Sequence, residues 1–389
     1  MKLLVVTHNY PRFGGDPSGA FVARIAERAA AKGGTVRVLA PHTAGAAPEE
    51  AIRGVSIRRF RYGPDRLEKV AYTGDLHRGS LRSPLVAAAF PGFVWAFRRA
   101  IRQEIRTRAP DVVHAHWWLP SGLLASGAAR RLLVTCHGSD VALLAHAVFR
   151  PLAARVFRRA VGVTTVSRFL AAELIARFPW IQPRLEVLPM PVDSSLFATG
   201  RSQPKRTPPV ILFAGNLVPT KGVDVLLQAV ARLRAENVSC RLRILGEGPS
   251  EPGLRDLAQR LGLTDVEWSP FLPQDRMPAE YGASTITVLP SRGRSEGLGL
   301  TLVEALLAGS AVVGSAVGGI PEVVVDRVTG LLVRNGDADD LAGALRELLQ
   351  DPALRNRLSD AGRVFVTDIY GADTAADAFL ELYARTDRR

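Results

Sequence analysis

The sequence has few cysteines and no apolar run long enough to cross a membrane. Its 389 residues include two cysteines, Cys136 and Cys240, both within apolar segments. This predicts buried thiols instead of disulfides, and therefore a reducing compartment, the cytoplasm. The apolar run at residues 1–7 is too short for the core of a signal peptide, so we expect no export. The longest nearly uncharged stretch, residues 84–97, is shorter than the roughly 20 residues that span a bilayer.

Acidic residues are scarce in the first half of the chain. The formal net charge is +13, and residues 1–200 contain 28 Lys and Arg against 13 Asp and Glu, whereas residues 201–389 contain 22 against 24. Such a field favours an anionic partner, namely acidic lipid, a phosphorylated acceptor or nucleic acid, although arginines can also simply solvate helix faces. Zinc-ligand spacing, RNP-like strands and basic heptads are all lacking, so we expect no nucleic-acid partner.

The hydrophobic pattern indicates a globular α/β protein of two domains. Short β-branched runs alternate with segments of helical period, in one series up to residue 188 and in another from residue 210. Two tandem Rossmann-like, doubly wound parallel sheets facing a central cleft are predicted. We place the first domain at residues 1–195 and the second at 196–371, and we expect the last helix, about 372–389, to pack back on the first domain. One expected helix of the first domain covers residues 122–131.

The most informative segment runs from Glu296 through Gly297, Leu298 and Gly299 into a helical stretch that contains Glu304. The two glycines let the backbone approach a ligand closely, and the helix that begins near residue 299 or 300 directs free amides at whatever precedes it. This predicts an anion site in which one carboxylate meets a sugar and the other a ribose. A glycine turn before an ordinary buried helix is the alternative.

A second segment leaves a strand, turns at Gly215 and Asn216, and reaches Lys221 and Gly222 at the start of a helix. A lysine there can neutralise a diphosphate as a flexible point charge. The alternative is a lysine solvated beside a turn.

Together these motifs resemble the retaining glycosyltransferases of family GT4, which have the GT-B fold. The spacing of Glu296 and Glu304 matches the family's E-x7-E pattern, and Gly215 with Lys221 and Gly222 matches its glycine-basic-x4-K-G pattern. Three further segments match in order: Tyr10-Pro11 with Gly14 and Gly15, Cys136-His137-Gly138-Ser139-Asp140, and Val317-Gly318-Gly319-Ile320-Pro321-Glu322. The resemblance covers almost the whole chain.

The resemblance implies a role for each matching residue. Lys221 is expected to bind the donor diphosphate, Glu296 the donor sugar and Glu304 the ribose, and His137 faces the donor sugar. Lys221, Glu296 and His137 are the predicted catalytic residues. The expected donor-binding residues also include Gly14, Gly15, Gly215, Asn216, Gly246, Gly297, Leu298 and Gly299.

The sequence departs from the family pattern at Asn216, where an arginine is usual, so diphosphate neutralisation depends more on Lys221. His116, Trp117 and Trp118 are assigned to the acceptor side, since aromatic faces suit sugars, with a buried core as the alternative. Asp337 and Asp339 have the spacing of a metal-binding D-x-D pattern but precede a helical run, where aspartates cap free amides. We therefore expect neither a metal site nor a cofactor.

The predicted enzyme transfers a hexose-type sugar from a nucleoside-diphosphate sugar, UDP-linked in preference to GDP-linked, to a hydroxyl of a glycan or lipid-linked acceptor. The synthesis of a surface polysaccharide or glycolipid is the expected role. The basic first half further predicts docking on an anionic membrane surface through arginines that follow the apolar residues 85–97. Two alternatives remain, a nicotinamide-dependent oxidoreductase of two Rossmann domains and a catalytically silent scaffold that binds sugar nucleotides. The oxidoreductase would need a G-x-G-x-x-G motif after the first strand, and residues 8–19 do not supply it.

Overall fold

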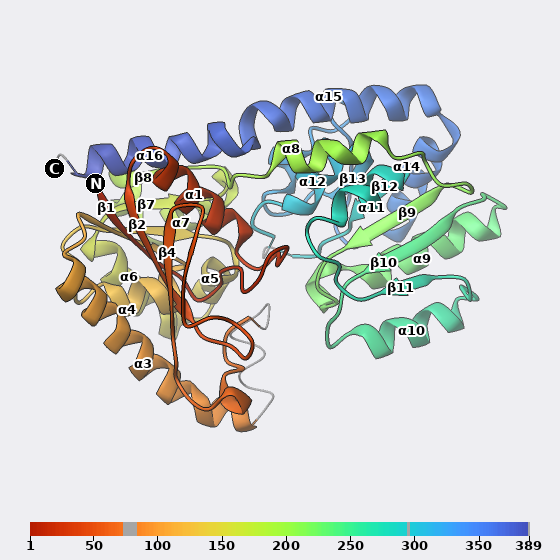
Figure 1. Ribbon diagram of the computed structural model, residues 1–389. Helices are drawn as coiled ribbons and strands as arrows, with labels where there is room; N and C mark the ends of the chain where they lie inside the picture. The colour runs from red at the N-terminus through yellow and green to blue at the C-terminus, as the bar shows by residue number, and fades with distance from the viewer. Residues whose placement is uncertain (73–83, 294–295, 388–389) are drawn as a thin grey trace. The chain divides into compact units, whose positions relative to one another are not determined.

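The chain forms two compact units (Figure 1). The computed structural model describes residues 1–72, 84–293 and 296–387. Unit 1 comprises Met1–Pro191 and a C-terminal segment that begins at Asp373, and unit 2 comprises Val192–Ala372. Unit 2 is therefore an insertion between two parts of unit 1, with its first boundary four residues before the predicted one.

The described part of unit 1 contains an eight-stranded sheet in the order β3-β4-β2-β1-β5-β6-β7-β8. Neighbouring strands are parallel except for the antiparallel pair β3 and β4. The strands are β1 (Lys2–Val6), β2 (Thr35–Pro41), β3 (Glu49–Ile52), β4 (Val55–Phe60), β5 (Val112–His116), β6 (Leu132–Cys136), β7 (Ala160–Thr165) and β8 (Leu185–Val187). Every residue of β5 and β6 is buried, as expected for a parallel sheet covered on both faces.

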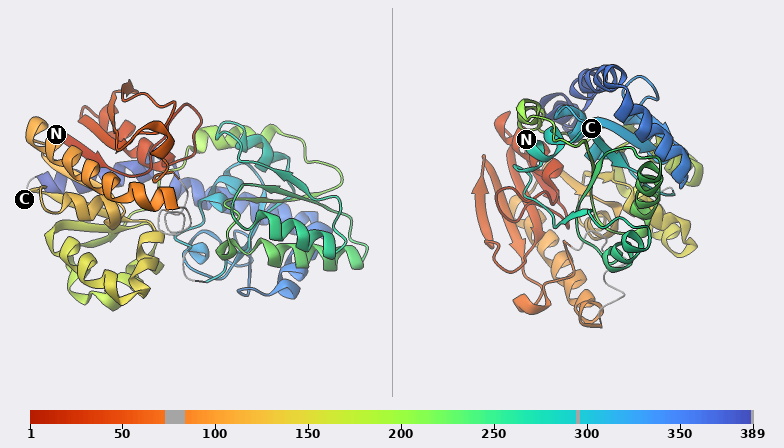
Figure 2. Two further views of the ribbon diagram at one scale, coloured as in Figure 1. Left: turned by 90° about the horizontal axis from the view of Figure 1, so that it is seen from below. Right: turned by 90° about the vertical axis from the view of Figure 1, so that its right-hand side faces the viewer.

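The helices of unit 1 cover this sheet. They are α1 (Ala20–Ala31), α3 (Pro84–Arg108), α4 (Leu123–Ala125), α5 (Ser139–Ala142), α6 (Arg150–Arg159), α7 (Arg168–Arg177) and α16 (Ala372–Asp387). Helix α16 packs beside α1, where Arg28 donates two hydrogen bonds of 2.8 and 2.7 Å to Asp377 (Figures 1 and 2). The predicted helix at 122–131 is wrong beyond Ala125, because the Ser126 hydroxyl donates to the carbonyl of Leu123 and the chain turns away.

The described part of unit 2 contains a six-stranded parallel sheet in the order β11-β10-β9-β12-β13-β14. The strands are β9 (Val210–Ala214), β10 (Arg241–Leu245), β11 (Glu267–Ser269), β12 (Ile286–Leu289), β13 (Ala311–Ser315) and β14 (Leu331–Val333). The central strands β9, β12 and β13 are buried along their whole length. These short apolar runs are the ones that the hydrophobic pattern predicts as strands.

The helices of unit 2 connect these strands and cover the sheet. They are α8 (Ser194–Ala198), α9 (Val223–Ala235), α10 (Glu251–Arg260), α11 (Met277–Ala283), α12 (Leu300–Leu307), α13 (Ile320–Val323), α14 (Ala338–Gln350) and α15 (Pro352–Tyr370). Asp337 caps α14 by accepting hydrogen bonds from the backbone N–H groups of Asp339 and Asp340, which confirms the capping role predicted for this segment.

Two expectations about the whole chain can be compared with the structure. Cys136 and Cys240 are both free thiols and both buried, which confirms that prediction. Of the helices within the described residues, none has the length and apolar character needed to cross a membrane.

Candidate active site

The predicted donor-binding residues of unit 2 gather where its strand order reverses. From β9 the chain moves outward to β10 and β11, then returns to place β12 on the other side of β9 and continues to β13 and β14. Ligands of open α/β sheets bind at the carboxyl ends of the strands at such a reversal. The loops that follow β9 and β12 are those that carry Lys221 and Glu296.

Two of the predicted glycines lie in backbone contact at this sheet edge. Gly215 follows β9 and Gly246 follows β10, and the latter has φ of +148°. A Cβ added to Gly246 would lie 1.9 Å from the carbonyl oxygen of Gly215. The two turns can therefore pack together only when residue 246 is glycine.

Lys221 ends a short helical turn, η7 (Pro219–Lys221), that leads into α9. Gly222 follows in a left-handed conformation, and a Cβ there would lie 2.0 Å from the carbonyl oxygen of Pro290. The loop after β9 is thus pressed against the loop after β12. In addition, the backbone N–H of Arg292 donates to the carbonyl of Thr220 at 2.7 Å.

This contact brings Lys221 to Glu296. The ammonium nitrogen of Lys221 lies 2.7 Å from Oε2 of Glu296, and the hydroxyl of Ser291 donates to the same oxygen at 2.7 Å. Burial alone would raise the pKa of Glu296, but the positive charge of Lys221 and these hydrogen bonds outweigh it and hold the pKa below its ordinary value. The carboxylate is therefore charged and oriented before any ligand arrives.

The segment after Glu296 leads directly into α12. Gly297, Leu298 and Gly299 are buried, and α12 begins at Leu300, as predicted. The carbonyl of Glu296 accepts a hydrogen bond of 3.0 Å from the backbone N–H of Gly319, in the predicted glycine segment after β13. The amino end of α12 therefore faces the loop that carries Glu296, and its free amides and positive dipole end favour an anion there.

Glu304 lies one turn further along α12 and is half-buried. It accepts a hydrogen bond of 3.0 Å from the hydroxyl of Tyr281 on α11. Burial, together with the negative charge of Glu304, raises the pKa of Tyr281 well above its ordinary value, so this phenol stays protonated and donates. Sequence reasoning missed Tyr281, because no local motif surrounds it.

Asn216 lies half-exposed in the loop after β9. Within the described residues its side chain forms no hydrogen bond or ion pair. The amide is therefore free to contact a ligand, although it carries no charge.

Unit 1 has its own reversal, between β1 and β5. The glycine loop after β1 contains Gly14 and Gly15, of which Gly14 is exposed and Gly15 half-buried. Arg12 pairs with Asp16 at 2.6 Å, and Arg59 of β4, whose side chain is fully buried, donates to the carbonyl of Pro11 at 2.7 Å. These contacts fix both ends of the loop and leave its glycines accessible.

His116, at the end of β5, lies close to His137, in the loop after β6. Strand β5 is the neighbour of β1, the strand that precedes the glycine loop. Nδ1 of His116 lies 3.1 Å from Nε2 of His137. Burial, reinforced by the neighbouring histidines, holds the pKa of each of these two rings well below its ordinary value, so both are neutral at physiological pH. His137 is half-exposed, whereas His116 is completely buried.

The loop that carries His137 is organised by Asp140, to which sequence reasoning gave no separate role. Oδ1 of this buried carboxylate accepts hydrogen bonds from the backbone N–H groups of His137, Gly138 and Val141, and Oδ2 accepts one from Trp118. Burial outweighs these hydrogen bonds and raises the pKa of Asp140. The segment His137-Gly138-Ser139-Asp140 is thus a turn held rigid by hydrogen bonds to the carboxylate of Asp140.

Trp117 and Trp118, which were assigned to the acceptor side with a buried core as the alternative, are both buried. Trp118 is fully buried, and its indole N–H donates to the carbonyl of Asp140 at 2.7 Å. Trp117 is 7% exposed and packs against the rings of His8 and His137. Both side chains stabilise the turn after β5, and His116 is likewise enclosed, so none of the three offers an open face to a sugar.

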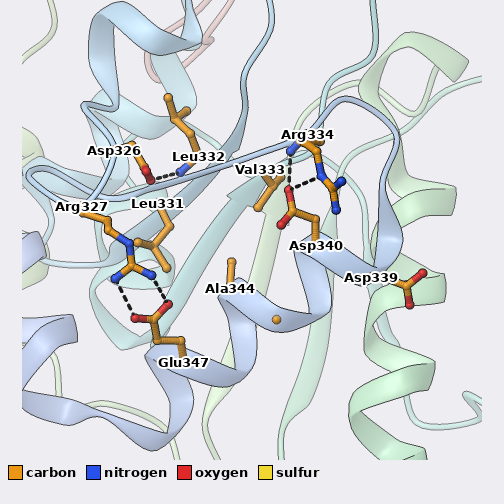
Figure 3. Close-up of a pocket in the computed structure, with 11 residues that line it drawn as sticks. Asp326, Arg327, Leu331, Leu332, Val333, Arg334, Asp339, Asp340, Ala344 and Glu347 are labelled. Carbon is orange, nitrogen blue, oxygen red and sulfur yellow. Dashed lines mark hydrogen bonds and ion pairs between the residues drawn. The ribbon is translucent and has the colours of Figure 1, made fainter.

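One hollow of about 520 Å³ lies between β14 and α14 and contains none of the predicted donor residues (Figure 3). Its charges are matched within the chain, since Arg327 pairs with Glu347 through two hydrogen bonds of 2.9 and 3.0 Å. Oδ2 of Asp340 accepts the backbone N–H of Arg334, beside the end of β14. These side chains protect the edge of the sheet, and we assign the hollow no ligand.

The structure thus has two doubly wound sheets, and where the second sheet reverses its strand order a lysine, a carboxylate and the amino end of α12 lie together. Residues 18–196 match the family model described as glycosyltransferase family 4, and residues 198–365 match glycosyl transferases group 1. The chain belongs to glycosyltransferase family 4. This confirms the resemblance seen in the sequence and excludes the oxidoreductase alternative.

Named relatives and solved structures are consistent with this assignment. A D-inositol 3-phosphate glycosyltransferase from Streptomyces scabiei is 31% identical over 95% of this chain and 86% of the relative. A GDP-mannose-dependent alpha-(1-6)-phosphatidylinositol monomannoside mannosyltransferase from Mycolicibacterium smegmatis is 32% identical over 65% of this chain and 70% of the relative. The sucrose-phosphate synthase of Thermosynechococcus elongatus has the same fold, with a TM-score of 0.81, 23% identity and coverage of 99% of this chain and 98% of that one.

Proposed function

We propose that the protein is a retaining glycosyltransferase that transfers a hexose from a nucleoside-diphosphate sugar to an acceptor hydroxyl, without a metal ion. The observation that carries this proposal is the 2.7 Å pair of Lys221 and Glu296 beside the amino end of α12. A cation and a helix amino terminus together attract a diphosphate, and an oriented carboxylate accepts hydrogen bonds from sugar hydroxyls.

The mechanism follows from these positions. Lys221 and the first amides of α12 stabilise the negative charge that develops on the departing diphosphate, while Glu296 orients the donor sugar. Glu304, held by Tyr281, accepts hydrogen bonds from the ribose hydroxyls. The departing phosphate itself assists removal of the acceptor proton on the same face of the sugar, which yields retention of configuration.

The acceptor that we propose carries a phosphate, as an inositol phosphate or a phosphatidylinositol-type glycolipid does. The names of two relatives contain such acceptors, and the first half of the chain has the excess of basic residues that an anionic acceptor favours. The biological role would be synthesis of a cell-surface glycolipid or polysaccharide in the cytoplasm.

We further propose that α3 docks unit 1 on an anionic membrane surface. Phe93 and Phe97 of this helix are buried core residues, but Trp95 is 65% exposed and Phe90 37% exposed. The guanidinium of Arg99 lies 5.5 Å from the centre of the Trp95 ring. The arginines exposed on the same helix are Arg98, Arg99, Arg102, Arg106 and Arg108. An aromatic side chain among arginines suits the headgroup region of an anionic bilayer.

The experiment that tests the enzymatic proposal is a thermal-shift panel of UDP, GDP, ADP and their sugars, with and without EDTA. A ligand at 100 times its Kd stabilises the native state by about 2.7 kcal/mol. The nucleotide that stabilises the protein is then assayed with inositol phosphate and phosphatidylinositol acceptors, and NMR of the product determines the anomeric configuration. Inversion at the anomeric carbon, or a strict requirement for a divalent ion, would contradict the proposed mechanism. An assay for a second product controls for epimerase activity.

A further inference from the structure

A buried series of hydrogen bonds links the C-terminal helix α16 to the central strand β5, which carries His114 and His116. The hydroxyl of Tyr383 on α16 lies 2.7 Å from Nδ1 of His114, and Nε2 of His114 lies 2.7 Å from Oγ1 of Thr135. Thr135 in turn contacts the hydroxyl of Thr164 at 2.6 Å. All four residues are at most 1% exposed.

The direction of this chain follows from the donors available. His114 has a pKa lowered to about 3 by burial, so it is neutral and has one donor nitrogen and one acceptor nitrogen. Tyr383 has no other hydrogen-bond partner within the described residues. One direction of these hydrogen bonds leaves the O–H of Thr164 without an acceptor, and the other direction leaves the O–H of Tyr383 without one. Because a phenol O–H is a stronger donor than an alkyl hydroxyl, leaving the Thr164 O–H unpaired costs less free energy. Tyr383 therefore donates to Nδ1 of His114, whose Nε2–H donates to Thr135.

A similar argument applies to the next histidine. Nδ1 of His116 faces Nε2 of His137, while Nε2 of His116 is buried and has no hydrogen-bond partner within the described residues. A buried N–H without an acceptor is more costly than a bare ring nitrogen, so the proton of His116 lies on Nδ1 and is donated to His137. His137 then accepts at Nε2 and carries its own proton on Nδ1. Within the described residues no partner takes that proton.

The two pairs are in direct contact. His114 and His116 alternate along β5, share one face of the sheet, and have ring centres 4.2 Å apart. The hydrogen bond from Tyr383 holds the imidazole ring of His114 in place, and His116 packs against that ring. His116 in turn fixes the ring of His137.

We propose that Tyr383 is a positioning residue that, through the packed rings of His114 and His116, holds the ring of His137 in place, so that its Nδ1–H donor is presented to the sugar substrate. The tautomers follow from this chain's own contacts, whereas the identity of the group that receives the proton rests on the proposed glycosyltransferase function. Tyr383 does not touch the substrate itself.

The test combines Tyr383→Phe, which removes only the hydroxyl, with Phe379→Leu as the matched control. Phe379 is on the same helix and its ring centre lies 5.8 Å from that of His114, but it forms no hydrogen bond with the histidine. Both variants should lose some stability. Long-range ¹H–¹⁵N spectra of ¹⁵N-histidine-labelled protein report the tautomers of the seven histidines, and the His137 signals are assigned by their loss in His137→Gln.

In the wild type we expect His137 and His116 as Nδ1–H tautomers and His114 as Nε2–H. Tyr383→Phe should give mixed tautomers at His114, shift the His137 signals through the ring contact of His114 with His116, and lower kcat by about tenfold, with the donor KM within about twofold, because the lost contact orients a group without removing binding. Phe379→Leu should keep the wild-type tautomers and kcat.

Two results would overturn the proposal. One is an Nε2–H tautomer of His137 in the wild type, and this measurement does not depend on how any variant folds. The other is a folded Tyr383→Phe protein with unchanged histidine spectra and unchanged kcat. Because the spectra require no turnover, absence of glycosyl transfer would refute the proposed function without deciding the tautomers.

Discussion

The ammonium group of Lys221 and the carboxylate of Glu296 form an ion pair of 2.7 Å between residues 75 positions apart in the sequence. The side chains are 26% and 11% exposed, so the pair is partly shielded from solvent. Under the proposed function, a donor diphosphate that enters the site would add negative charge beside a carboxylate that Lys221 already neutralises. The lysine would then be shared between substrate and protein, and its removal should affect both ligand binding and stability.

Removal of individual site residues should separate binding from turnover. Lys221→Ala and Glu304→Ala should each weaken the affinity for the nucleotide sugar by about 10–100-fold, the equivalent of one or two charge-assisted hydrogen bonds. Glu296→Ala should lower kcat more than it lowers affinity, because Glu296 is assigned to the transferred sugar. Calorimetric titration and initial rates measure both effects, with Arg241→Ala, an exposed residue of the same unit, as control. Three folded variants that bind and turn over like the wild type would refute the site.

The stability contribution of the Lys221 and Glu296 pair should depend on pH. In the wild type the pKa of Glu296 is lowered in the folded state, so the pair's contribution is present above the glutamate's unfolded pKa and is lost as pH falls through the folded value. In Lys221→Met, burial remains without the cation, and the pKa of Glu296 should rise instead. The variant should then be less stable than the wild type by about 1–2 kcal/mol at pH 7, a value discounted for partial exposure.

This difference should shrink as the pH is lowered towards 3, because protonated Glu296 no longer needs a partner. Urea unfolding of the wild type, Lys221→Met and the double variant Lys221→Met/Glu296→Gln at pH 7, 5 and 3 measures it. The double variant should recover part of the loss at pH 7. A difference that stays constant with pH would show that the ion pair is not its cause.

Restoring the charge that the family pattern has at residue 216 should strengthen diphosphate binding. Asn216→Arg adds a planar, bidentate cation to a half-exposed position in the loop that also carries Lys221, and we expect about tenfold tighter binding of the nucleoside diphosphate. Asn216→Gln, which lengthens the side chain without charge, is the control. Equal affinities of Asn216→Arg and the wild type would show that residue 216 does not face the phosphates.

The close contact of the turns after β9 and β10 should make Gly246 irreplaceable. Gly246→Ala would place a Cβ 1.9 Å from the carbonyl oxygen of Gly215 and should lower the free energy of unfolding by about 3 kcal/mol or more. Gly33→Ala is the matched control, since its φ of +84° is also positive but the added Cβ would meet nothing within 4 Å. It should cost only the backbone strain, about 1 kcal/mol. Denaturant unfolding compares the two, and similar losses would exclude the backbone contact as the reason for Gly246.

Docking by α3 should be visible as salt-dependent binding to anionic vesicles. Basic residues near such a surface contribute about 1 kcal/mol each, so the triple variant Arg98→Gln/Arg99→Gln/Arg102→Gln should lose about 3 kcal/mol of binding at low salt. Trp95→Ala should weaken binding at all salt concentrations. The matched control neutralises three exposed arginines of unit 2, Arg241, Arg255 and Arg357. If the wild type does not sediment with anionic vesicles at low salt, the enzyme acts away from the membrane.

The residues that the sequence identified are those that belong to a short local motif. Glu296 and the glycines after it lead into α12 at the expected residue, and Lys221 ends the turn before α9. Tyr281 was missed because only the packing of α11 brings it to Glu304. Ser291, five residues before Glu296 in the same loop, was missed because it belongs to none of the motifs. No local pattern marks Tyr281, whose role depends on a partner 23 residues away.

The errors have equally specific causes. Trp118 was assigned to the acceptor side because aromatic rings suit sugars, yet its ring is buried; the same rings fill cores, and composition cannot distinguish these two environments. Strand β4 was not predicted, because Arg58 and Arg59 interrupt its apolar pattern. In the fold the side chain of Arg59 is completely buried, paired with Glu50 and hydrogen-bonded to the carbonyl of Pro11. From sequence alone an arginine is expected on the protein surface, whereas the tertiary structure provides Arg59 with an acidic partner and a carbonyl in the core.

The insertion of unit 2 within unit 1 bears on how the protein matures. The two ends of unit 2 lie side by side, since the backbone N–H of Val192 donates to the carbonyl of Tyr370 at 2.8 Å. Unit 2 is thus a closed segment that can fold as soon as it has been synthesised, as domains generally do. Unit 1 is complete only when α16 has been synthesised. Until then Arg28 on α1 lacks its partner Asp377, and His114 on β5 lacks its partner Tyr383. The part of the chain that is made first is therefore the part that is completed last.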